Sequence, residues 1–226
     1  MSRPYCACST PGAPLQFLVV MVPEGTLSPR LVSLEPGSML ALWPRAAGDF
    51  TLGSLTGTRD LWLIATGTGL GPFLSMLHTD EAWRRFRRIV VVHAVREASD
   101  LVGRDELAAL EPEVCWLPVV SRQPHLRGLG ATDDDHARPV LHGRVTDLLR
   151  TGELEAAAAR RLAPDGSRVM LCGNPGMVAD MTAELAARGL RTVGPDGRGQ
   201  VRGLAFWEPA DSGPAALRAG VAPGDR

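Results

Sequence analysis

The chain lacks lysine entirely, so all 24 of its basic side chains are arginines. The absence of lysine excludes Schiff-base chemistry and the lysine of a Walker-A phosphate loop. It favours planar, bidentate anion sites wherever arginines converge. The four cysteines form no Cys-x-x-Cys pair, so we expect neither a structural zinc site nor a four-cysteine iron–sulfur cluster.

Long apolar runs are also missing. No stretch is long enough to span a bilayer, and the first residues lack the apolar core of a signal peptide. A formal net charge of −1 gives no overall attraction to nucleic acid or to an anionic membrane. Four cysteines without a disulfide pattern fit a reducing compartment. Together these absences predict a soluble cytoplasmic protein, which we expect to be a monomer.

The strongest pattern that is present occupies residues 61–77. Residues 61–65 are apolar throughout, as in a strand that is buried on both faces. Three glycines at alternate positions then form a turn, and Pro72 suits the first position of a helix. Two interpretations of the turn remain open on this stretch alone. It either receives a phosphate at the helix start or needs glycine only for tight packing.

The spacing of apolar residues divides the chain into two parts. Before residue 58, short β-rich segments at 3–9, 15–22 and 38–42 predict a small antiparallel barrel, with a helical turn at 28–34 that Ser28 caps. After it, strands alternate with helices, which predicts a doubly wound parallel α/β sheet. We expect strands at 61–65, 88–95, 115–120, 167–172 and 201–207, and helices at 72–86, 104–111, 144–150 and 176–188. The predicted domains are residues 1–58 and 59–208, followed by a disordered tail at 209–226.

Arginines and polar residues follow the predicted parallel strands at their carboxyl ends, where ligands of such sheets bind. Arg96 follows the second strand, Ser121 and Arg122 follow the third, and Arg144 opens the next helix. Arginine donors in pairs suit a phosphomonoester, so this rim is a candidate phosphate site. Residues 123–139 are predicted to be a mobile surface loop, and the aspartates at 133–135 within it to be a solvated turn with no metal.

Other reactive side chains have simpler interpretations. Cys172 lies at a strand end beside Gly173, but an inert buried thiol is the usual state of a free cysteine. His93 stands within a run of valines and is interpreted as a core histidine. On a strand, Arg3 and Tyr5 would share one face and combine a phosphate contact with an aromatic stacking surface. A frayed chain end is the alternative interpretation of these residues.

These motifs, taken in order, resemble the bacterial ferredoxin–NADP(H) reductases, also called flavodoxin reductases. Arg3-Pro4-Tyr5-Cys6 is similar to the family's flavin motif Arg-x-Tyr-Ser, and residues 17–31 resemble the strand and phosphate-contacting turn that follow it. Ala65 to Phe73 reads as the pyridine-nucleotide motif Ala-Thr-Gly-Thr-Gly-x-x-Pro-Phe. Cys172 to Met177 reads as the closing Cys-Gly-Asn-Pro-x-Met. The resemblance implies NADPH-to-FAD electron transfer with ferredoxin or flavodoxin as partner.

The resemblance also implies roles for individual residues. Tyr5, Cys6 and Cys172 would lie beside the reacting rings as catalytic residues. The residues that would contact FAD are Arg3, Tyr5, Cys6, Val19, Val20, Thr26, Leu27, Ser28, Thr68, Phe206 and Trp207. The residues that would contact NADP(H) are Arg96, Ser121, Arg122, Arg144, Gly173, Asn174, Pro175 and Met177.

Two departures from the family accompany this resemblance. Cys6 replaces the motif's serine, and a thiol is a weaker hydrogen-bond donor than a hydroxyl. The family also carries further barrel strands ahead of Arg-x-Tyr-Ser, so the resemblance implies a partial FAD barrel here. Two alternative functions stay open: a reductase component that serves an oxygenase, and a truncated NADP(H)-binding relic without flavin.

Overall fold

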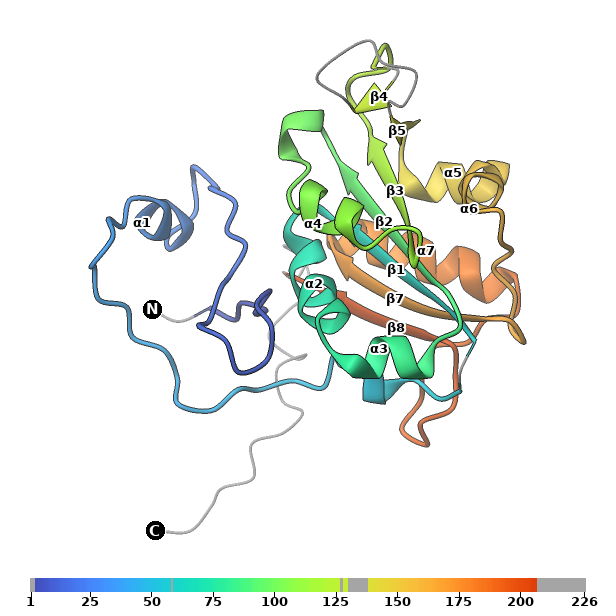
Figure 1. Cartoon of the computed structure of the whole chain (residues 1–226), viewed down its shortest axis with the longest axis horizontal. Helices are drawn as coiled ribbons and strands as arrows, with labels where there is room; N and C mark the ends of the chain where they lie inside the picture. The colour runs from blue at the N-terminus through green and yellow to red at the C-terminus, as the bar shows by residue number, and fades with distance from the viewer. Residues whose placement is uncertain (1–2, 58, 127, 130–137, 207–226) are drawn as a thin grey trace.

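A computed structural model describes residues 3–57, 59–126, 128–129 and 138–206 (Figure 1). Its centre is a six-stranded parallel sheet in the order β6-β3-β2-β1-β7-β8. The strands are β1 (Asp60–Thr66), β2 (Ile89–Val95), β3 (Val114–Val120), β6 (Leu141–His142), β7 (Ser167–Gly173) and β8 (Val201–Ala205). The near-continuous apolar runs of β1, β2, β3 and β7 are buried on both faces. The expected doubly wound α/β fold is confirmed.

Two apolar layers cover the two faces of the sheet, because alternate residues of each strand point to opposite sides. Trp62 and Ile64 of β1 belong to the layer that packs on α5 (Val145–Thr151), α6 (Glu153–Ala158) and α7 (Pro175–Ala187). Leu61 and Leu63 belong to the opposite layer, with α2 (Gly71–Leu77), α3 (Asp80–Arg85) and α4 (Arg104–Ala109). Figure 1 shows these two sets of helices on either side of the sheet. Among the described residues, no helix is long and apolar enough to cross a membrane.

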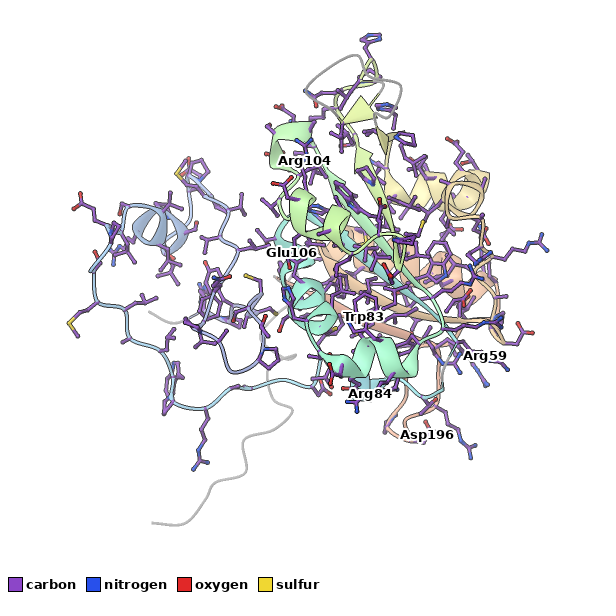
Figure 2. The ribbon with its side chains drawn as sticks, viewed as in Figure 1. Arg59, Trp83, Arg84, Arg104, Glu106 and Asp196 are labelled. Atoms are coloured by element: carbon purple, nitrogen blue, oxygen red, sulfur yellow. The ribbon has the colours of Figure 1, made fainter. Side chains whose placement is uncertain are left out.

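The single helix expected over residues 72–86 is two helices, α2 and α3. Thr79 interrupts them with extended backbone, and its hydroxyl donates to the carbonyl of Met76 at 2.7 Å. Trp83 of α3 (Figure 2) donates from its indole nitrogen to the carbonyl of Leu77 at 2.9 Å, which ties the second helix to the end of the first. The apolar spacing alone does not reveal this break. The helix α6 and the short 3₁₀ turn η3 (Ala98–Asp100) were likewise not predicted.

The strands expected before residue 58 are wrong. Within residues 3–57 the backbone forms one isolated antiparallel bridge, between Ala7 and Phe17, one short α-helix, α1 (Ser28–Val32), and one 3₁₀ turn near its end. The reason is that a strand is stable only when its N–H and C=O groups pair with a neighbour, and segments 15–22 and 38–42 find almost no such partners here. Leu27, not Ser28, occupies the N-cap of α1. The Ser28 hydroxyl instead accepts a hydrogen bond from the Val22 N–H at 3.0 Å.

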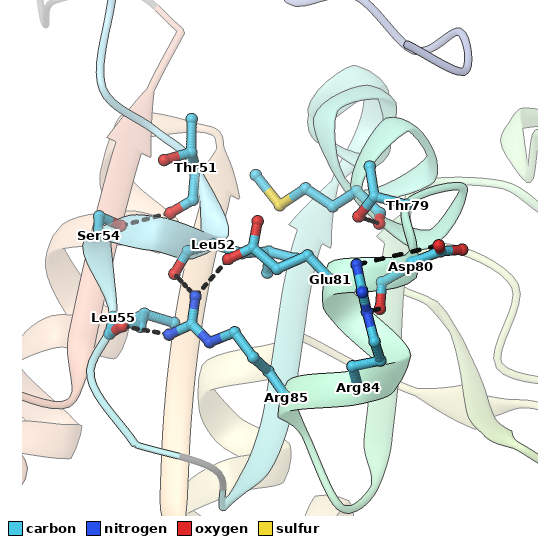
Figure 3. Close-up of polar contacts among 10 residues, drawn as sticks. Thr51, Leu52, Ser54, Leu55, Thr79, Asp80, Glu81, Arg84 and Arg85 are labelled. Atoms are coloured by element: carbon cyan, nitrogen blue, oxygen red, sulfur yellow. Dashed lines mark hydrogen bonds and ion pairs between the residues drawn. The ribbon is translucent and has the colours of Figure 1, made fainter.

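The connection from this N-terminal part to the sheet is anchored by arginines. It contains the 3₁₀ turn η1 (Leu52–Ser54), whose Leu52 is buried together with Leu55. The guanidinium of Arg85 on α3 donates to the carbonyls of Leu52 (3.0 Å) and Leu55 and pairs with Glu81 (Figure 3). Arg168 at the start of β7 donates to the carbonyl of Thr56. These contacts fix the point where the chain enters the sheet.

Some expectations fall at or beyond the limits of the described residues. The loop expected at 123–139 contains a short antiparallel pair, β4 (Gly128–Leu129) and β5 (Arg138–Pro139). The aspartates at 133–135, Trp207 and the expected tail at 209–226 lie outside the described residues. The last strand, expected over 201–207, ends at Ala205 as β8.

Candidate functional site

The site is organised around the place where the strand order of the sheet reverses. β1 has β2 on one side and β7 on the other. In open parallel sheets, ligands bind in the crevice beyond the carboxyl ends of two such strands. Thr66 and Gly67 stand at the end of β1, and Gly173 and Asn174 at the end of β7. The backbone N–H of Asn174 donates to the Thr66 hydroxyl at 2.8 Å, which joins the two strand ends.

The glycines at this junction serve packing between backbones. A Cβ atom on Gly69 would overlap the carbonyl oxygen of Cys172, and one on Gly173 would overlap the Thr66 hydroxyl. The 3₁₀ turn η2 (Gly67–Leu70) therefore lies directly against the end of β7. Gly67 differs, because its φ is +53° and a Cβ there would meet nothing within 4 Å. Of the two interpretations left open by the sequence, packing explains Gly69, whereas Gly67 faces open space.

Asn174 begins the long helix α7 beside this junction. It is the only asparagine in the chain, and its side-chain oxygen accepts a hydrogen bond from the Met177 N–H at 3.2 Å as the helix N-cap. Pro175 follows in the first turn. The Asn174 side chain remains exposed, whereas the Met177 side chain is buried in the core that covers this face. The Met177 side chain therefore offers a ligand little surface.

Three exposed arginines line the adjacent strand ends, as the sequence predicts. The N–H of Arg122 donates to the carbonyl of Arg96 at 2.9 Å, so the two residues leave β3 and β2 side by side. Gly143 bonds to the carbonyl of Val120 at 3.1 Å, which brings the following Arg144 to the same edge. Ser121 directly precedes Arg122, and its hydroxyl donates to the carbonyl of Val95, the residue before Arg96, at 3.3 Å.

The charge environment of these arginines is distinctive. No carboxylate within the described part of the chain forms an ion pair with Arg96, Arg122 or Arg144. At the opposite, amino edge of the sheet, Arg84 is paired with Asp80 at 3.9 Å (Figure 3). The carboxyl edge thus presents three guanidiniums whose donors are available to an external anion.

His93 contributes to the site in a way that the sequence does not reveal. As predicted, it is fully buried in β2. Its Nε2 atom also lies 3.0 Å from the carbonyl oxygen of Gly67 in the turn. Burial lowers the pKa of the ring to about 4, against the hydrogen bond to Gly67, which raises it. The ring is therefore neutral at pH 7, and neither the spacing nor the composition of β2 indicates its long-range contact.

The two cysteines predicted to be catalytic lie near each other. Burial raises the pKa of the Cys172 thiol strongly, and the nearby Cys6 raises it further. Burial also raises the pKa of Cys6. Both thiols are therefore protonated at pH 7, and Cys172 is fully buried beneath the strand end. Phe206 follows β8 and bonds through its N–H to the carbonyl of Gly173 at 3.0 Å, beside the same strand end.

The predicted flavin residues of the N-terminal part are mostly exposed. Tyr5 is 38% exposed and Val20 is 60% exposed. Arg3 and Thr26 are exposed, Val19, Leu27 and Thr68 are partly buried, and Ser28 is buried with its hydroxyl bonded to Val22. Leu18 packs against the sheet's apolar layer near Gly71, which brings this part of the chain alongside η2 and α2. Within the described ranges, no cluster of His, Cys, Asp and Glu could hold a metal ion.

Comparisons with known proteins identify relatives of this chain. The family model for the oxidoreductase NAD-binding domain matches residues 63–183. The flavodoxin/ferredoxin–NADP reductase of Shigella flexneri is 38% identical over 181 residues, which cover 80% of this chain and 70% of that protein. Ferredoxin–NADP reductase A of Sorangium cellulosum is 36% identical over 187 residues, covering 77% of this chain and 62% of that protein.

A solved structure shows the same relationship. The ferredoxin NADP⁺ reductase from Neisseria gonorrhoeae, with bound FAD and NADP, superposes with a TM-score of 0.79 at 29% identity. The superposition covers 90% of this chain and 79% of that one. Fold, motif order and sequence identity agree, and the chain belongs to the flavodoxin/ferredoxin–NADP reductase family.

Proposed function

We propose that this chain is a flavin-dependent oxidoreductase that passes electrons from NADPH through FAD to ferredoxin or flavodoxin. The observation that carries the proposal is the rim of three arginines without carboxylate partners in the described structure, beside the switch point of a parallel sheet. The names of its relatives, and the FAD and NADP bound in the Neisseria protein, support it.

The residues at the carboxyl edge fit NADP(H). A terminal phosphate is a dianion that accepts hydrogen bonds, and Arg96, Arg122 and Arg144 offer paired donors at neighbouring strand ends. We therefore assign these arginines and Ser121 to the 2′-phosphate of the adenosine. Gly173, Asn174, Pro175 and the backbone of Met177 would hold the nicotinamide end, close to the open face of the turn at Gly67.

The N-terminal residues fit an aromatic cofactor. Tyr5, Val19 and Val20 leave aromatic and apolar surface uncovered, which a flat ring system would bury. Arg3, Thr26, Leu27 and Ser28 would bind the pyrophosphate of FAD. Because the Ser28 hydroxyl already bonds to Val22, we expect its contribution to come from its backbone. Thr68 and Phe206 would cover the flavin from the α/β domain, and the same role for Trp207 lies outside the described residues.

When bound, FAD supplies the redox chemistry by accepting a hydride from NADPH and releasing electrons one at a time. The chain's residues bind the two cofactors, orient them and exclude water. Cys6 is proposed to stand beside the rings as a neutral thiol, since its pKa is raised. The Cys172 thiol, also neutral but fully buried, would support the strand end from beneath without touching the rings. No general base is needed, which agrees with a buried, neutral His93.

The experiment is to purify the chain, add FAD, and measure bound flavin and the NADPH-dependent reduction of ferricyanide. We expect a yellow protein that oxidises NADPH. A colourless, inactive product that still binds NADP⁺ by calorimetry would replace the proposal with the flavin-free alternative.

The phosphate assignment is checked in the same assay with Arg122→Ala and Arg144→Ala. Losing a charge-assisted hydrogen bond of about 1.5 kcal/mol lowers the ratio of kcat/KM for NADPH over NADH by roughly tenfold. Arg84→Ala at the amino edge is the matched control and should leave the ratio unchanged. If all three variants kept the wild-type ratio, Arg122 and Arg144 would not bind the 2′-phosphate.

The partner and setting complete the proposal. Ferredoxin or flavodoxin is proposed as the electron acceptor because the relatives carry these names. All four cysteines are free thiols, which supports a reducing, cytoplasmic location. We further propose that the chain acts as a monomer.

A further inference from the structure

His93 occupies a special place in the sheet. In the register of the strands, Ala65 of β1 lies opposite His93 of β2 on one side and opposite Cys172 of β7 on the other. Ala65 and Cys172 belong to the apolar layer that packs on α2, and His93 faces the same side because it alternates with Val92. The smallest side chain of this row therefore lies between a histidine and a cysteine, beneath the turn η2.

The turn is held from both sides of that row. On the β7 side, Gly69 packs so closely on the Cys172 carbonyl that a side chain would not fit. On the β2 side, the Nε2 atom of His93 lies 3.0 Å from the Gly67 carbonyl. A carbonyl oxygen only accepts hydrogen bonds, so Nε2 carries the hydrogen and donates it. Gly67 has a φ of +53°, and this contact holds its peptide group in one orientation.

Packing alone does not explain why a polar histidine ring occupies position 93. His93 has no exposed surface, and within the described chain its Nδ1 atom has no hydrogen-bond partner. A leucine would fill such a position in a strand of valines without leaving a buried polar atom unpaired. The benefit of histidine at this position is the bond to Gly67, one residue before Thr68.

We propose that His93 is a positioning residue of the nucleotide site: it fixes the turn η2 so that Gly67 stays open and Thr68 points to the cofactors. The inference deepens the proposed function and rests on it, because it assumes that the nicotinamide nucleotide binds beside this turn. His93 touches no reacting atom and acts only through the backbone of Gly67.

The test compares three variants of the full chain. His93→Leu removes the donor, His93→Gln keeps an amide donor at a similar reach, and His93→Asn keeps the amide but is too short to reach Gly67. We expect NADP⁺ binding, measured by calorimetry, to weaken three- to tenfold in His93→Leu and His93→Asn, and to stay within twofold in His93→Gln. Equal affinities in all variants that fold would overturn the proposal, even where their thermal midpoints differ.

A second measurement keeps the inference separate from the function that it assumes. Hydrogen exchange of peptides covering residues 67–70 reports the turn directly, with or without nucleotide. We expect faster exchange in His93→Asn than in His93→Gln, two variants that bury the same amide. Wild-type protein that binds no NADP⁺ would refute the proposed function, whereas unchanged exchange in His93→Asn would refute the role of His93.

Discussion

At the scale of the residue, His93 makes stability depend on pH. Its pKa falls from 6.5 in the unfolded chain to about 4 in the folded protein, chiefly because burial disfavours the charged ring. Between these values the unfolded chain binds the proton and the folded chain does not. The contribution of the neutral His93 ring to the free energy of unfolding is thus complete above pH 6.5. It decreases as the pH falls toward 4 and changes no further below that value.

The corresponding prediction concerns the free energy of unfolding measured in urea at pH 7.5 and at pH 5. His93 should cost the wild type about 2 kcal/mol over this interval, at 1.36 kcal/mol per pKa unit. His93→Gln has no such titration, whereas its carboxylates and other histidines are those of the wild type. Parallel losses in the two proteins would show that His93 is not held neutral by the fold.

The same scale shows what the sequence can predict about the site. The shared location of Arg96, Arg122 and Arg144 was predicted because the carboxyl ends of parallel strands meet at one edge, a rule that needs only the strand positions. The contact of His93 with Gly67 was missed, because it joins β2 to the turn η2. Packing was one of two interpretations open for Gly69, and its neighbour Cys172 on β7 decides between them. No local spacing encodes such a contact.

At the scale of the element, Arg85 connects α3 to the turn η1. Its guanidinium donates to the carbonyls of Leu52 in η1 and of Leu55 just after it, two residues whose side chains are buried. Arg85→Ala removes a donor from each of these carbonyls. Leu52 keeps the Leu55 N–H as a donor, so the cost of about 1–3 kcal/mol falls mainly on the Leu55 carbonyl. Hydrogen exchange over residues 49–57 should accelerate, and the urea midpoint should fall.

Arg84→Ala provides the control on the same helix. Arg84 is exposed and pairs with Asp80 at 3.9 Å, an arrangement that contributes less than about 1 kcal/mol. An Arg84→Ala loss as large as that of Arg85→Ala would mean that the helix α3, and not the contact to η1, sets the stability of this connection.

The elements also show the limits of sequence patterns. β1, β2, β3 and β7 were predicted within about one residue, because continuous apolar runs identify strands buried on both faces. The helix at 72–86 was predicted without its break, since the Thr79 hydroxyl that closes α2 leaves the apolar spacing unchanged. The early strands were wrong because strand formation depends on neighbours, and β-propensity at 15–22 does not supply them.

At the scale of the whole molecule, burial differs greatly between its two parts. The sheet and its helices contain almost all of the fully buried side chains, whereas Met39, Trp43 and Val20 are 97%, 79% and 60% exposed. Backbone hydrogen bonds are correspondingly sparse over residues 38–48. Segments with exposed backbone and few contacts open at low free energy and are cut first by proteases.

Limited proteolysis should therefore cleave first within residues 20–48 and leave a resistant fragment that begins near η1 and contains the sheet.

The two cofactors are proposed to bind different parts of the chain, so they should protect it differently. NADP⁺ should raise the thermal midpoint of the resistant fragment's unfolding, because a ligand at 100 times its Kd adds about 2.7 kcal/mol to the folded state. FAD should slow the cleavage within 20–48, since Val20 and Thr26 belong to its proposed site. Protection by NADP⁺ alone would favour the flavin-free alternative, and protection by neither would contradict both cofactor sites. The cleavage rate depends on whether the backbone is accessible to the protease, and not on activity. The comparison therefore detects FAD binding even in a protein that binds flavin but does not turn over.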